Sequence, residues 1–131
     1  MAKDTSFTVL IIEDETPLLN AISHKLRTFG FEVATARTVE QAFGYMEDID
    51  NVDAVWLNHY LLGNMSGLDF LEKIKNRPEW KDIPVFVVTN TAGYDKKAIY
   101  MRLGATEYYI KSENRLDDII NNIKKTLEGN S

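Results

Sequence analysis

The chain has 131 residues, the length of one compact domain, with 44% hydrophobic and 27% charged residues, which excludes a disordered protein. The absence of cysteine excludes thiol catalysis, cysteine-based zinc sites and iron–sulfur clusters. The net charge of −5 argues against a general nucleic-acid or anionic-membrane binder, since phosphate contacts require a basic surface. No hydrophobic run approaches the roughly 20 residues that cross a bilayer, and residues 1–6 have no signal-peptide pattern, so we expect a cytoplasmic location.

Five short hydrophobic runs, rich in β-branched or aromatic residues, recur along the chain. They are Phe7–Ile12, Phe31–Ala34, Ala54–Leu57, Val85–Val88 and Tyr108–Ile110. Four of them are nearly free of polar residues, which is typical of strands that are covered on both faces. The runs therefore predict five strands of a sheet buried between two layers.

The segments between and after these runs carry hydrophobic residues at helical spacing. In the first segment these residues are Leu18, Leu19, Ile22, Leu26 and Phe29, and in the second they are Val39, Ala42, Phe43, Met46 and Ile49. The third segment has Leu68, Leu71 and Ile74. The last segment has Leu116, Ile119, Ile120, Ile123 and Leu127. The fourth segment, Asp95–Leu103, offers Ala98 and Met101 and is the least clear helix. Strand and helix thus alternate five times, which predicts a parallel α/β sheet with helices on both faces.

Capping residues mark some of the expected helix ends. Thr16 followed by Pro17 predicts an N-cap with proline at the first helical position, and Gly30 predicts a left-handed C-terminal cap. Asn114 and Asp117 form the expected capping pair of the last helix.

Polar residues follow the predicted strands where an open α/β sheet binds its ligands, beyond the carboxyl ends. They are Glu13, Asp14 and Glu15; Asn58, His59 and Tyr60; Thr89 and Asn90; and Lys111. Clustered carboxylates repel one another unless a cation joins them, and Mg²⁺ accepts carboxylate and carbonyl oxygens. The hydroxyl of Thr89 and the ammonium of Lys111 would then suit a phosphoryl group. We therefore expect a magnesium and phosphoryl site at this edge.

The nucleophile of such a site is missing. A carboxylate at the end of the third strand could accept a phosphoryl group, but Asn58 stands there, and its amide is not a competent nucleophile. No second histidine lies at helical spacing from His24 or His59, so we expect these two on a helix surface and in a loop rather than on a metal.

Taken together, the strand-end motifs resemble the receiver domain of bacterial two-component response regulators. The motifs are Glu13-Asp14 after a hydrophobic strand, Trp56-Leu57-Asn58, Val87-Val88-Thr89 and Tyr109-Ile110-Lys111. The resemblance covers roughly Thr8 to Leu127 and implies a flavodoxin-like fold, a single doubly wound domain with five parallel strands in the order 2-1-3-4-5. We expect this domain at residues 7–127, between polar tails at residues 1–6 and 128–131.

The resemblance also implies a magnesium site. Asp14 would bind Mg²⁺ directly, Glu13 would support it partly through water, and the backbone carbonyl of Tyr60 would be a further ligand. Asn58 would face the metal through its carbonyl oxygen. Since this residue replaces an anionic ligand by a neutral one, we expect weakened Mg²⁺ binding.

The remaining roles implied by the resemblance concern the phosphoryl group and the switch. Lys111 would be the phosphoryl-binding cation and Thr89 the switching hydroxyl. Tyr108 would be the aromatic residue that turns inward on activation, coupled to Thr89. The side chains of Tyr60 and Thr91 would tune dephosphorylation by controlling the access of water.

Three positions depart from the family pattern. Asn58 stands at the phosphoacceptor position, either as the natural residue of an atypical receiver or as an engineered Asp→Asn change, and the site should not be phosphorylated. Ser112 replaces the proline that commonly follows the lysine. The loop from Asn58 to Gly67 is one residue longer than usual and has Leu62 where proline is common.

We therefore expect a stand-alone response regulator receiver without enzymatic activity. Its Asp form would accept phosphate from a sensor histidine kinase or a phosphotransfer protein. It would signal to a downstream protein partner through the face of the fourth helix, fifth strand and fifth helix. The alternative, favoured by Asn58, is a phosphate-independent pseudo-receiver that acts as an interaction module.

Two other α/β classes fit less well. A metal-dependent phosphohydrolase would need acidic residues spaced by one after the first strand, whereas positions 13, 15 and 17 are Glu, Glu and Pro. A flavin would be repelled by the acidic residues at 13–15.

Overall fold

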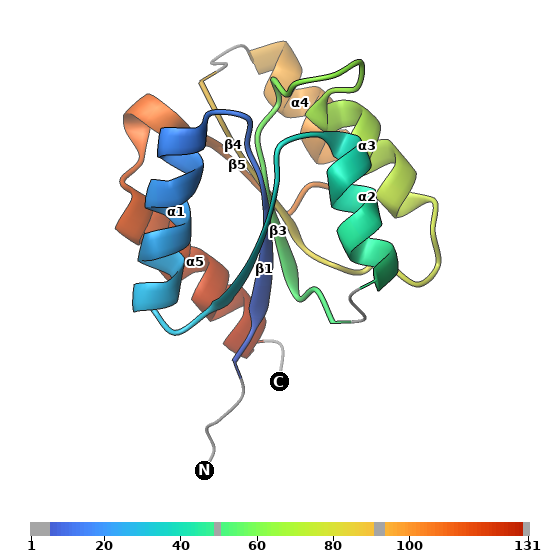
Figure 1. Cartoon of the computed structure of the whole chain (residues 1–131). Helices are drawn as coiled ribbons and strands as arrows, with labels where there is room; N and C mark the ends of the chain where they lie inside the picture. The colour runs from blue at the N-terminus through green and yellow to red at the C-terminus, as the bar shows by residue number, and fades with distance from the viewer. Residues whose placement is uncertain (1–5, 49–50, 91–93, 130–131) are drawn as a thin grey trace.

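The computed structural model describes residues 6–48, 51–90 and 94–129, and its centre is a parallel sheet (Figure 1). The strands are β1 (Thr8–Ile12), β2 (Glu32–Ala36), β3 (Ala54–Leu57), β4 (Val85–Thr89) and β5 (Glu107–Ile110). Their order in the sheet is β2-β1-β3-β4-β5, and every pair is parallel. The expected flavodoxin-like topology is confirmed. Phe31, which opened the second hydrophobic run, lies just before β2.

Helices cover both faces of the sheet. They are α1 (Thr16–Thr28), α2 (Val39–Asp48), α3 (Gly67–Lys75), α4 (Tyr94–Arg102) and α5 (Leu116–Gly129), with a short 3₁₀ turn η1 (Lys111–Glu113) before α5. In Figure 1, α1 and α5 lie on one side of the sheet, and α2, α3 and α4 lie on the other. Ile49, expected in the second helix, lies outside the described residues.

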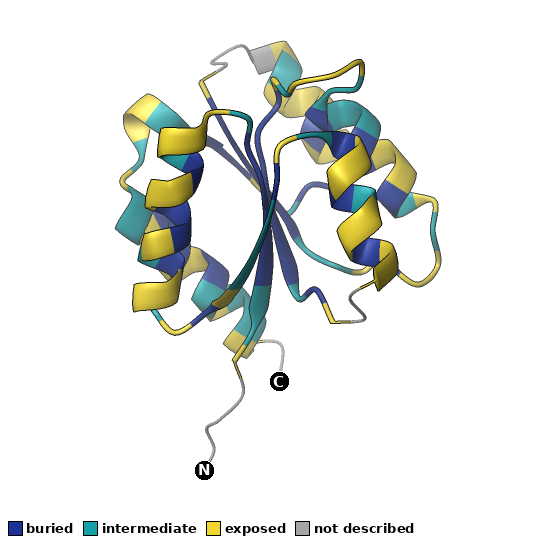
Figure 2. Cartoon of the chain, in the orientation of Figure 1, coloured by how far each residue is buried: buried dark blue, intermediate teal, exposed yellow. Residues whose placement is uncertain are grey.

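The strands supply a hydrophobic core to each helical layer, because successive side chains of a strand point to opposite faces. In β1, Val9 and Ile11 pack in the cluster under α1 and α5, whereas Leu10 and Ile12 pack in the cluster under α2, α3 and α4. Figure 2 shows the central strands buried along much of their length and the helices buried on their inner sides. The sheet is thus covered on both faces, as the continuous hydrophobic runs predicted.

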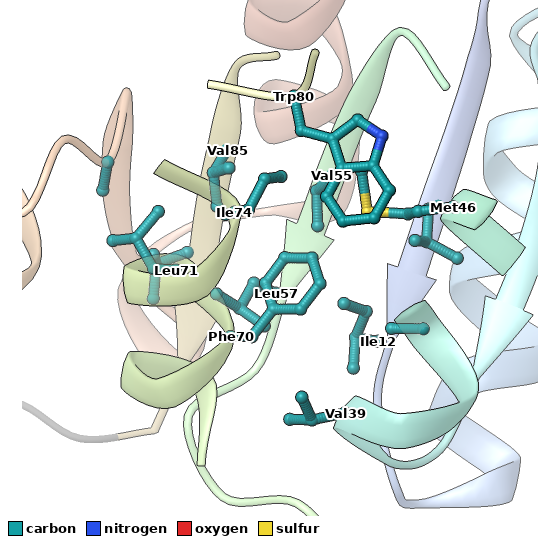
Figure 3. Close-up of a cluster of buried hydrophobic side chains, with 14 of the residues drawn as sticks. Ile12, Val39, Met46, Val55, Leu57, Phe70, Leu71, Ile74, Trp80 and Val85 are labelled. Atoms are coloured by element: carbon teal, nitrogen blue, oxygen red, sulfur yellow. The ribbon is translucent and has the colours of Figure 1, made fainter. Parts of the chain in front are cut away.

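Aromatic side chains fill part of the second cluster. Phe43 packs against Phe70 with ring centroids 5.2 Å apart and stacks on Trp80 at 5.9 Å. Phe70 and Trp80 are both buried and converge with Met46 and Leu57 in Figure 3. These contacts hold α2 and α3 against the sheet.

The ends of α1 agree with the prediction in part. Glu15, not Thr16, is the N-cap, and its side chain makes no capping hydrogen bond; Pro17 lies in the first turn as expected. Gly30, with φ of 96°, has the left-handed conformation predicted from its position after the helix.

The expected capping pair of α5 is wrong. Asn114 donates its side-chain N–H to the carbonyl oxygen of Ile110 at 3.0 Å. Asp117 accepts a hydrogen bond from Lys25 of α1 at 2.6 Å. The Asp117 carboxylate, which the sequence spacing predicted as part of the cap, is therefore bonded to a residue of another helix.

Helix α4 is attached differently from the prediction. Ala98 and Met101 were expected to face the core, but both are exposed. Within residues 95–102, Tyr100 is the one buried side chain. No helix in the described part of the chain is long and hydrophobic enough to cross a membrane.

Candidate functional site

The carboxyl ends of four strands bring the predicted site residues to one edge of the sheet, at the top of Figure 1. Pairing aligns Ile12 of β1 with Leu57 of β3, and the ladder continues with a hydrogen bond from the Asn58 N–H to the Ile12 carbonyl at 3.0 Å. The residues that follow or end the strands at this edge are Glu13, Asn58, Thr89 and Lys111.

Glu13 lies at the centre of this group and is fully buried. Its Oε1 accepts from Lys111 Nζ at 3.0 Å, and its Oε2 accepts from the backbone N–H of Glu15 at 3.1 Å and from Asn58 Nδ2 at 3.5 Å. The Lys111 side chain is only 16% exposed, so this ion pair is largely withdrawn from water. The ends of β1, β3 and β5 are therefore joined through one carboxylate.

Burial raises the pKa of Glu13, because removal from water disfavours the charged carboxylate. The N–H of Glu15 and the ammonium of Lys111 act against this shift, and the neighbouring side chain of Asp14 adds to it. The net direction is upward.

The amide of Asn58 has a defined orientation. Its Nδ2 donates to the backbone carbonyl of Tyr60 at 2.7 Å as well as to Glu13. Because a carbonyl and a carboxylate oxygen only accept, the nitrogen of the amide must face them. The amide nitrogen thus bridges two of the atoms that were expected to bind Mg²⁺.

The remaining donor set suits a hard cation. Glu13 and Asp14 supply carboxylates, Tyr60 supplies a carbonyl, and Asn58 would supply its Oδ1 after a half-turn of the amide, and these are oxygen ligands of the kind Mg²⁺ takes. Among the described residues, no group of three or more acidic or histidine side chains is positioned for a metal. The residues fit Mg²⁺, with one neutral side chain where a third anion would lie.

The carbonyl oxygen of Asp14 is held from outside the site. It accepts from Arg37 Nε at 3.1 Å and Nη2 at 2.9 Å. Arg37 directly follows β2, so this contact joins the backbone of the β1–α1 loop to the neighbouring strand.

The expected switch residues lie at the same side of the sheet. Thr89, the last residue of β4, is fully buried and is aligned with Ile110 of β5. Tyr108 is buried, and its ring centroid lies 5.7 Å from that of Tyr100. The side chain of Tyr60 is 61% exposed, while Thr91 lies outside the described residues.

A buried polar contact next to the site was missed by sequence reasoning. His59 is in a loop, as expected, but it is buried, and its Nδ1 lies 2.6 Å from the hydroxyl of Tyr100. Lys96 Nζ lies 3.2 Å from His59 Nε2. Since an ammonium only donates, Nε2 must accept, and Nδ1–H donates to the tyrosine oxygen. Burial, followed by the charge of Lys96, lowers the pKa of His59 and favours this neutral form.

Gly67 lets these groups approach one another. A Cβ at this position would lie 2.6 Å from the Tyr100 hydroxyl and 2.7 Å from the Asn58 carbonyl oxygen. Its own N–H donates to the His59 carbonyl at 2.9 Å. His24, in contrast, is exposed on α1 as predicted. The one sequence signal for this contact was a tyrosine within an otherwise weakly amphipathic helix.

Comparison of the sequence with known proteins identifies the family to which the chain belongs. The family model "Response regulator receiver domain" matches residues 9–124. The phosphate regulon transcriptional regulatory protein PhoB of Pseudomonas aeruginosa is 28% identical over 104 residues, which are 79% of this chain and 44% of that protein. The chemotaxis protein CheY1 of Helicobacter pylori is 24% identical over 105 residues, which are 79% of this chain and 83% of that protein.

Solved structures agree with the fold. A CheY-like response regulator receiver domain protein from Methanospirillum hungatei has a TM-score of 0.83 and 25% identity, covering 95% of this chain and 96% of that one. The chain spans less than half the length of the PhoB relative and more than four-fifths of CheY1. With a family model that matches nearly the whole described domain, this chain belongs to the response regulator receiver domains of two-component signalling.

Proposed function

We propose that this receiver domain does not accept a phosphoryl group at residue 58, and that its Asp form is the phosphate-accepting state of the same protein. The observation that carries the proposal is the Asn58 amide, which donates to Tyr60 and Glu13 at the position where the family has its acceptor. An amide nitrogen in these hydrogen bonds offers no nucleophile for phosphoryl transfer. Donors for the phosphate would be a sensor histidine kinase or a phosphotransfer protein.

The other residues of the site are chemically suited to this role. Lys111 would neutralise a phosphoryl oxygen and would leave Glu13, its present partner at 3.0 Å, to do so. Thr89 would donate its hydroxyl to a second oxygen, and Tyr108 would respond to that change. Tyr60, whose side chain is exposed, and Thr91 would control the access of water.

Glu13, Asp14, the Tyr60 carbonyl and Asn58 Oδ1 are the groups we propose for Mg²⁺. The bound ion would supply positive charge opposite the phosphoryl oxygens. Asn58 must turn its amide to expose Oδ1, which breaks its hydrogen bonds to Tyr60 and Glu13. We therefore expect this chain to bind Mg²⁺ more weakly than its Asn58→Asp variant, with isothermal titration calorimetry as the measurement.

The deciding experiment restores the acceptor. Purified protein and its Asn58→Asp variant are incubated with acetyl phosphate and Mg²⁺, and intact mass is measured with and without EDTA. We expect one phosphoryl group on the Asp variant, at residue 58 by peptide mapping, and none on the parent chain. An Asn64→Asp variant, which places a new carboxylate in the exposed part of the same loop, is the matched control and should stay unmodified.

Failure of the Asp variant to gain a phosphoryl group would favour the second candidate, a phosphate-independent interaction module. The hydrogen bonds of Asn58 support that candidate as well, since they satisfy the site without metal or phosphate. In both cases we propose a downstream protein partner at the face of α4, β5 and α5. Ile99 and Met101 of α4, each 40% exposed, would contribute hydrophobic contacts there.

We propose that this chain has no enzymatic activity. The expectation of a stand-alone protein in the cytoplasm stays a prediction. So do the domain limits at residues 7–127.

A further inference from the structure

The turn between β2 and α2, formed by Arg37 and Thr38, lies beside the candidate site. The register of β1 and β2 aligns Ile12 with Ala36, so this turn emerges at the same edge of the sheet as the site (Figure 1). The pairing continues by one further step, because the N–H of Glu13 donates to the Ala36 carbonyl at 3.0 Å. The turn is therefore next to the loops that carry the groups proposed for Mg²⁺.

Arg37 holds the first of these loops, which joins β1 to α1. Its Nε and Nη2 both donate to the carbonyl oxygen of Asp14, at 3.1 Å and 2.9 Å. The Glu15 carbonyl accepts from the Leu19 N–H as part of α1, whereas the Asp14 carbonyl comes before the helix. Backbone acceptors outside regular structure take their partners from side chains or water. The planar guanidinium fixes this carbonyl with two donors of set geometry, which a single flexible donor would not do.

The peptide group between Asp14 and Glu15 is held at both of its ends. In a trans peptide the carbonyl and the N–H lie in one plane and point in opposite directions. Arg37 binds the carbonyl end from outside the site, and the N–H end donates to Glu13 Oε2 at 3.1 Å inside it. Hydrogen bonds arranged in such a chain polarise and strengthen one another. Arg37 thus acts through one peptide group on the two carboxylates proposed for Mg²⁺.

Thr38, the other residue of the turn, is joined to the second loop of the site. It pairs with Leu62 in an isolated parallel β-bridge. Gly63 follows with φ of 90°, and a Cβ at this position would lie 3.6 Å from Oε1 of Glu40 in the first turn of α2. This loop begins at Asn58 and is the one that is longer than usual in the family. Its middle is therefore docked on the same turn that holds the β1–α1 loop.

We propose that Arg37 is a positioning residue of the metal site, and that the β2–α2 turn clamps the two loops that supply its oxygen ligands. The inference rests on the Mg²⁺ site of the proposed function. As a charge alone, the guanidinium would oppose a divalent cation nearby, since like charges repel. As a positioning group, it favours the cation by holding Glu13 and Asp14 in place. The two roles therefore predict opposite changes in Mg²⁺ affinity when the guanidinium is removed.

Titration calorimetry with Mg²⁺ tests the sign of the effect in the Asn58→Asp background, where the third anion is present. We expect Arg37→Ala to weaken Mg²⁺ binding about tenfold, the scale on which the outer partners of metal ligands act. Arg37→Lys keeps the charge but not the planar pair of donors, so it should recover only part of the loss. Arg27→Ala is the matched control, because it removes the same charge from an exposed position in the last turn of α1. It should leave the affinity within about twofold, since salt screens distant surface charges.

A second measurement needs no metal and uses the chain with Asn58 in place. Amide hydrogen exchange in EDTA is followed by ¹H–¹⁵N spectra for the parent and for Arg37→Ala. The Glu15 N–H belongs to the peptide group that Arg37 holds, so its exchange should quicken in the variant, while exchange in α5 stays the same. The melting temperature should stay close to that of the parent. A general loss of stability would instead quicken exchange throughout the domain.

Unchanged or tighter Mg²⁺ binding in the Arg37→Ala variant would overturn the proposal, as would an equal loss in the Arg27→Ala variant. Failure of the proposed function gives a different result. If Asn58→Asp binds no Mg²⁺ while Arg37 is intact, the metal site itself is wrong. The exchange of the Glu15 amide then decides whether Arg37 holds the loop, and an unaltered rate would show that it does not.

Discussion

At the scale of single residues, Asn58 replaces electrostatic repulsion by hydrogen bonds. Its amide nitrogen faces the Tyr60 carbonyl at 2.7 Å and the Glu13 carboxylate at 3.5 Å. An aspartate in the same position would present an oxygen to both groups. The metal-free site is therefore compatible with the amide and strained by the acid.

We predict that Asn58→Asp lowers the stability of the metal-free protein by roughly 2–4 kcal/mol, from two lost hydrogen bonds and repulsion by Glu13. Urea unfolding and thermal melting in EDTA measure this change. Added Mg²⁺ should raise the melting temperature of the Asp variant more than that of the parent. Asn121→Asp, which adds the same charge at an exposed position of α5, should have little effect. A melting temperature of Asn58→Asp equal to or above that of the parent would contradict the prediction.

Alanine substitutions at Gly67 and Gly44 test whether the chain is crowded around Gly67. Alanine at Gly67 would place its Cβ 2.7 Å from the Asn58 carbonyl oxygen and 2.6 Å from the Tyr100 hydroxyl, so the backbone must shift. We expect Gly67→Ala to cost about 2 kcal/mol or more. Gly44 of α2 has nothing within 4 Å of such a Cβ, and alanine there should stabilise the helix by up to about 1 kcal/mol. Chemical denaturation of the two variants should give opposite signs, and equal signs would contradict the proposed crowding at Gly67.

At the scale of elements, α4 depends on a contact made far away in the sequence. Tyr100 is its buried anchor within residues 95–102, and the hydroxyl partner of Tyr100 is His59, in the loop after β3. The other hydrophobic residues with large side chains in this range, Ile99 and Met101, are exposed. The loop that carries Asn58 is thereby tied to the helix proposed as part of the output face.

We predict that Tyr100→Phe destabilises the protein by about 1–3 kcal/mol, because it leaves the buried Nδ1–H of His59 without an acceptor. Amide hydrogen exchange over residues 95–102 should quicken more than exchange in α1. In a double-mutant cycle, adding His59→Leu to Tyr100→Phe should cost less than the sum of the two single changes. Tyr109→Phe, which loses a partly exposed hydrogen bond to Asn122, is the milder control. Unaltered exchange in α4 would show that Tyr100 does not anchor it through His59.

The elements differ in how well the sequence predicted them. Strands and most helices follow from local hydrophobic spacing, so their order and approximate limits could be predicted. The hydrophobic side of α4 could not, because Tyr100 is held by a partner 41 residues away, and spacing favoured Ala98 and Met101 instead. The predicted capping pair at the start of α5 was wrong for a similar reason, since Asp117 is bonded to Lys25 on another helix.

The meeting of three predicted site residues at one edge of the sheet could be predicted, but their hydrogen bonds could not. Parallel strands deliver their carboxyl ends to one edge, so the meeting of Glu13, Asn58 and Lys111 follows from the topology. The pairing of Lys111 with Glu13 and the orientation of the Asn58 amide depend on side-chain packing in three dimensions.

At the scale of the whole molecule, buried tyrosines set the response to alkaline pH. Burial raises the pKa values of Tyr100, Tyr108 and Tyr109 above their ordinary value near 10. The unfolded chain then loses these protons first, so stability is full below pH 10 and falls as the pH rises toward the folded-state pKa values. Burial lowers the pKa of Lys75, which acts in the opposite direction but is a single group.

We predict that the urea midpoint at 25 °C decreases between pH 9 and pH 11, and that Tyr100→Phe shows a smaller decrease because one of the three phenols is gone. Absorbance of tyrosinate near 295 nm should rise in step with unfolding for the buried rings. A parent protein whose midpoint increases over this interval, or a variant with an unchanged slope, would contradict the assignment of this effect to the tyrosines.

The order β2-β1-β3-β4-β5 leaves β2 and β5 as the two open margins of the sheet, and each begins with an exposed glutamate, Glu32 and Glu107. Unpaired strand margins invite self-association between copies of a protein, and charged side chains there oppose it. Two molecules that approached margin to margin would bring like charges together while their main-chain groups were still unsatisfied. The strand order that places the site residues at one end of the sheet also leaves two edge strands, and the glutamates on these strands oppose aggregation there.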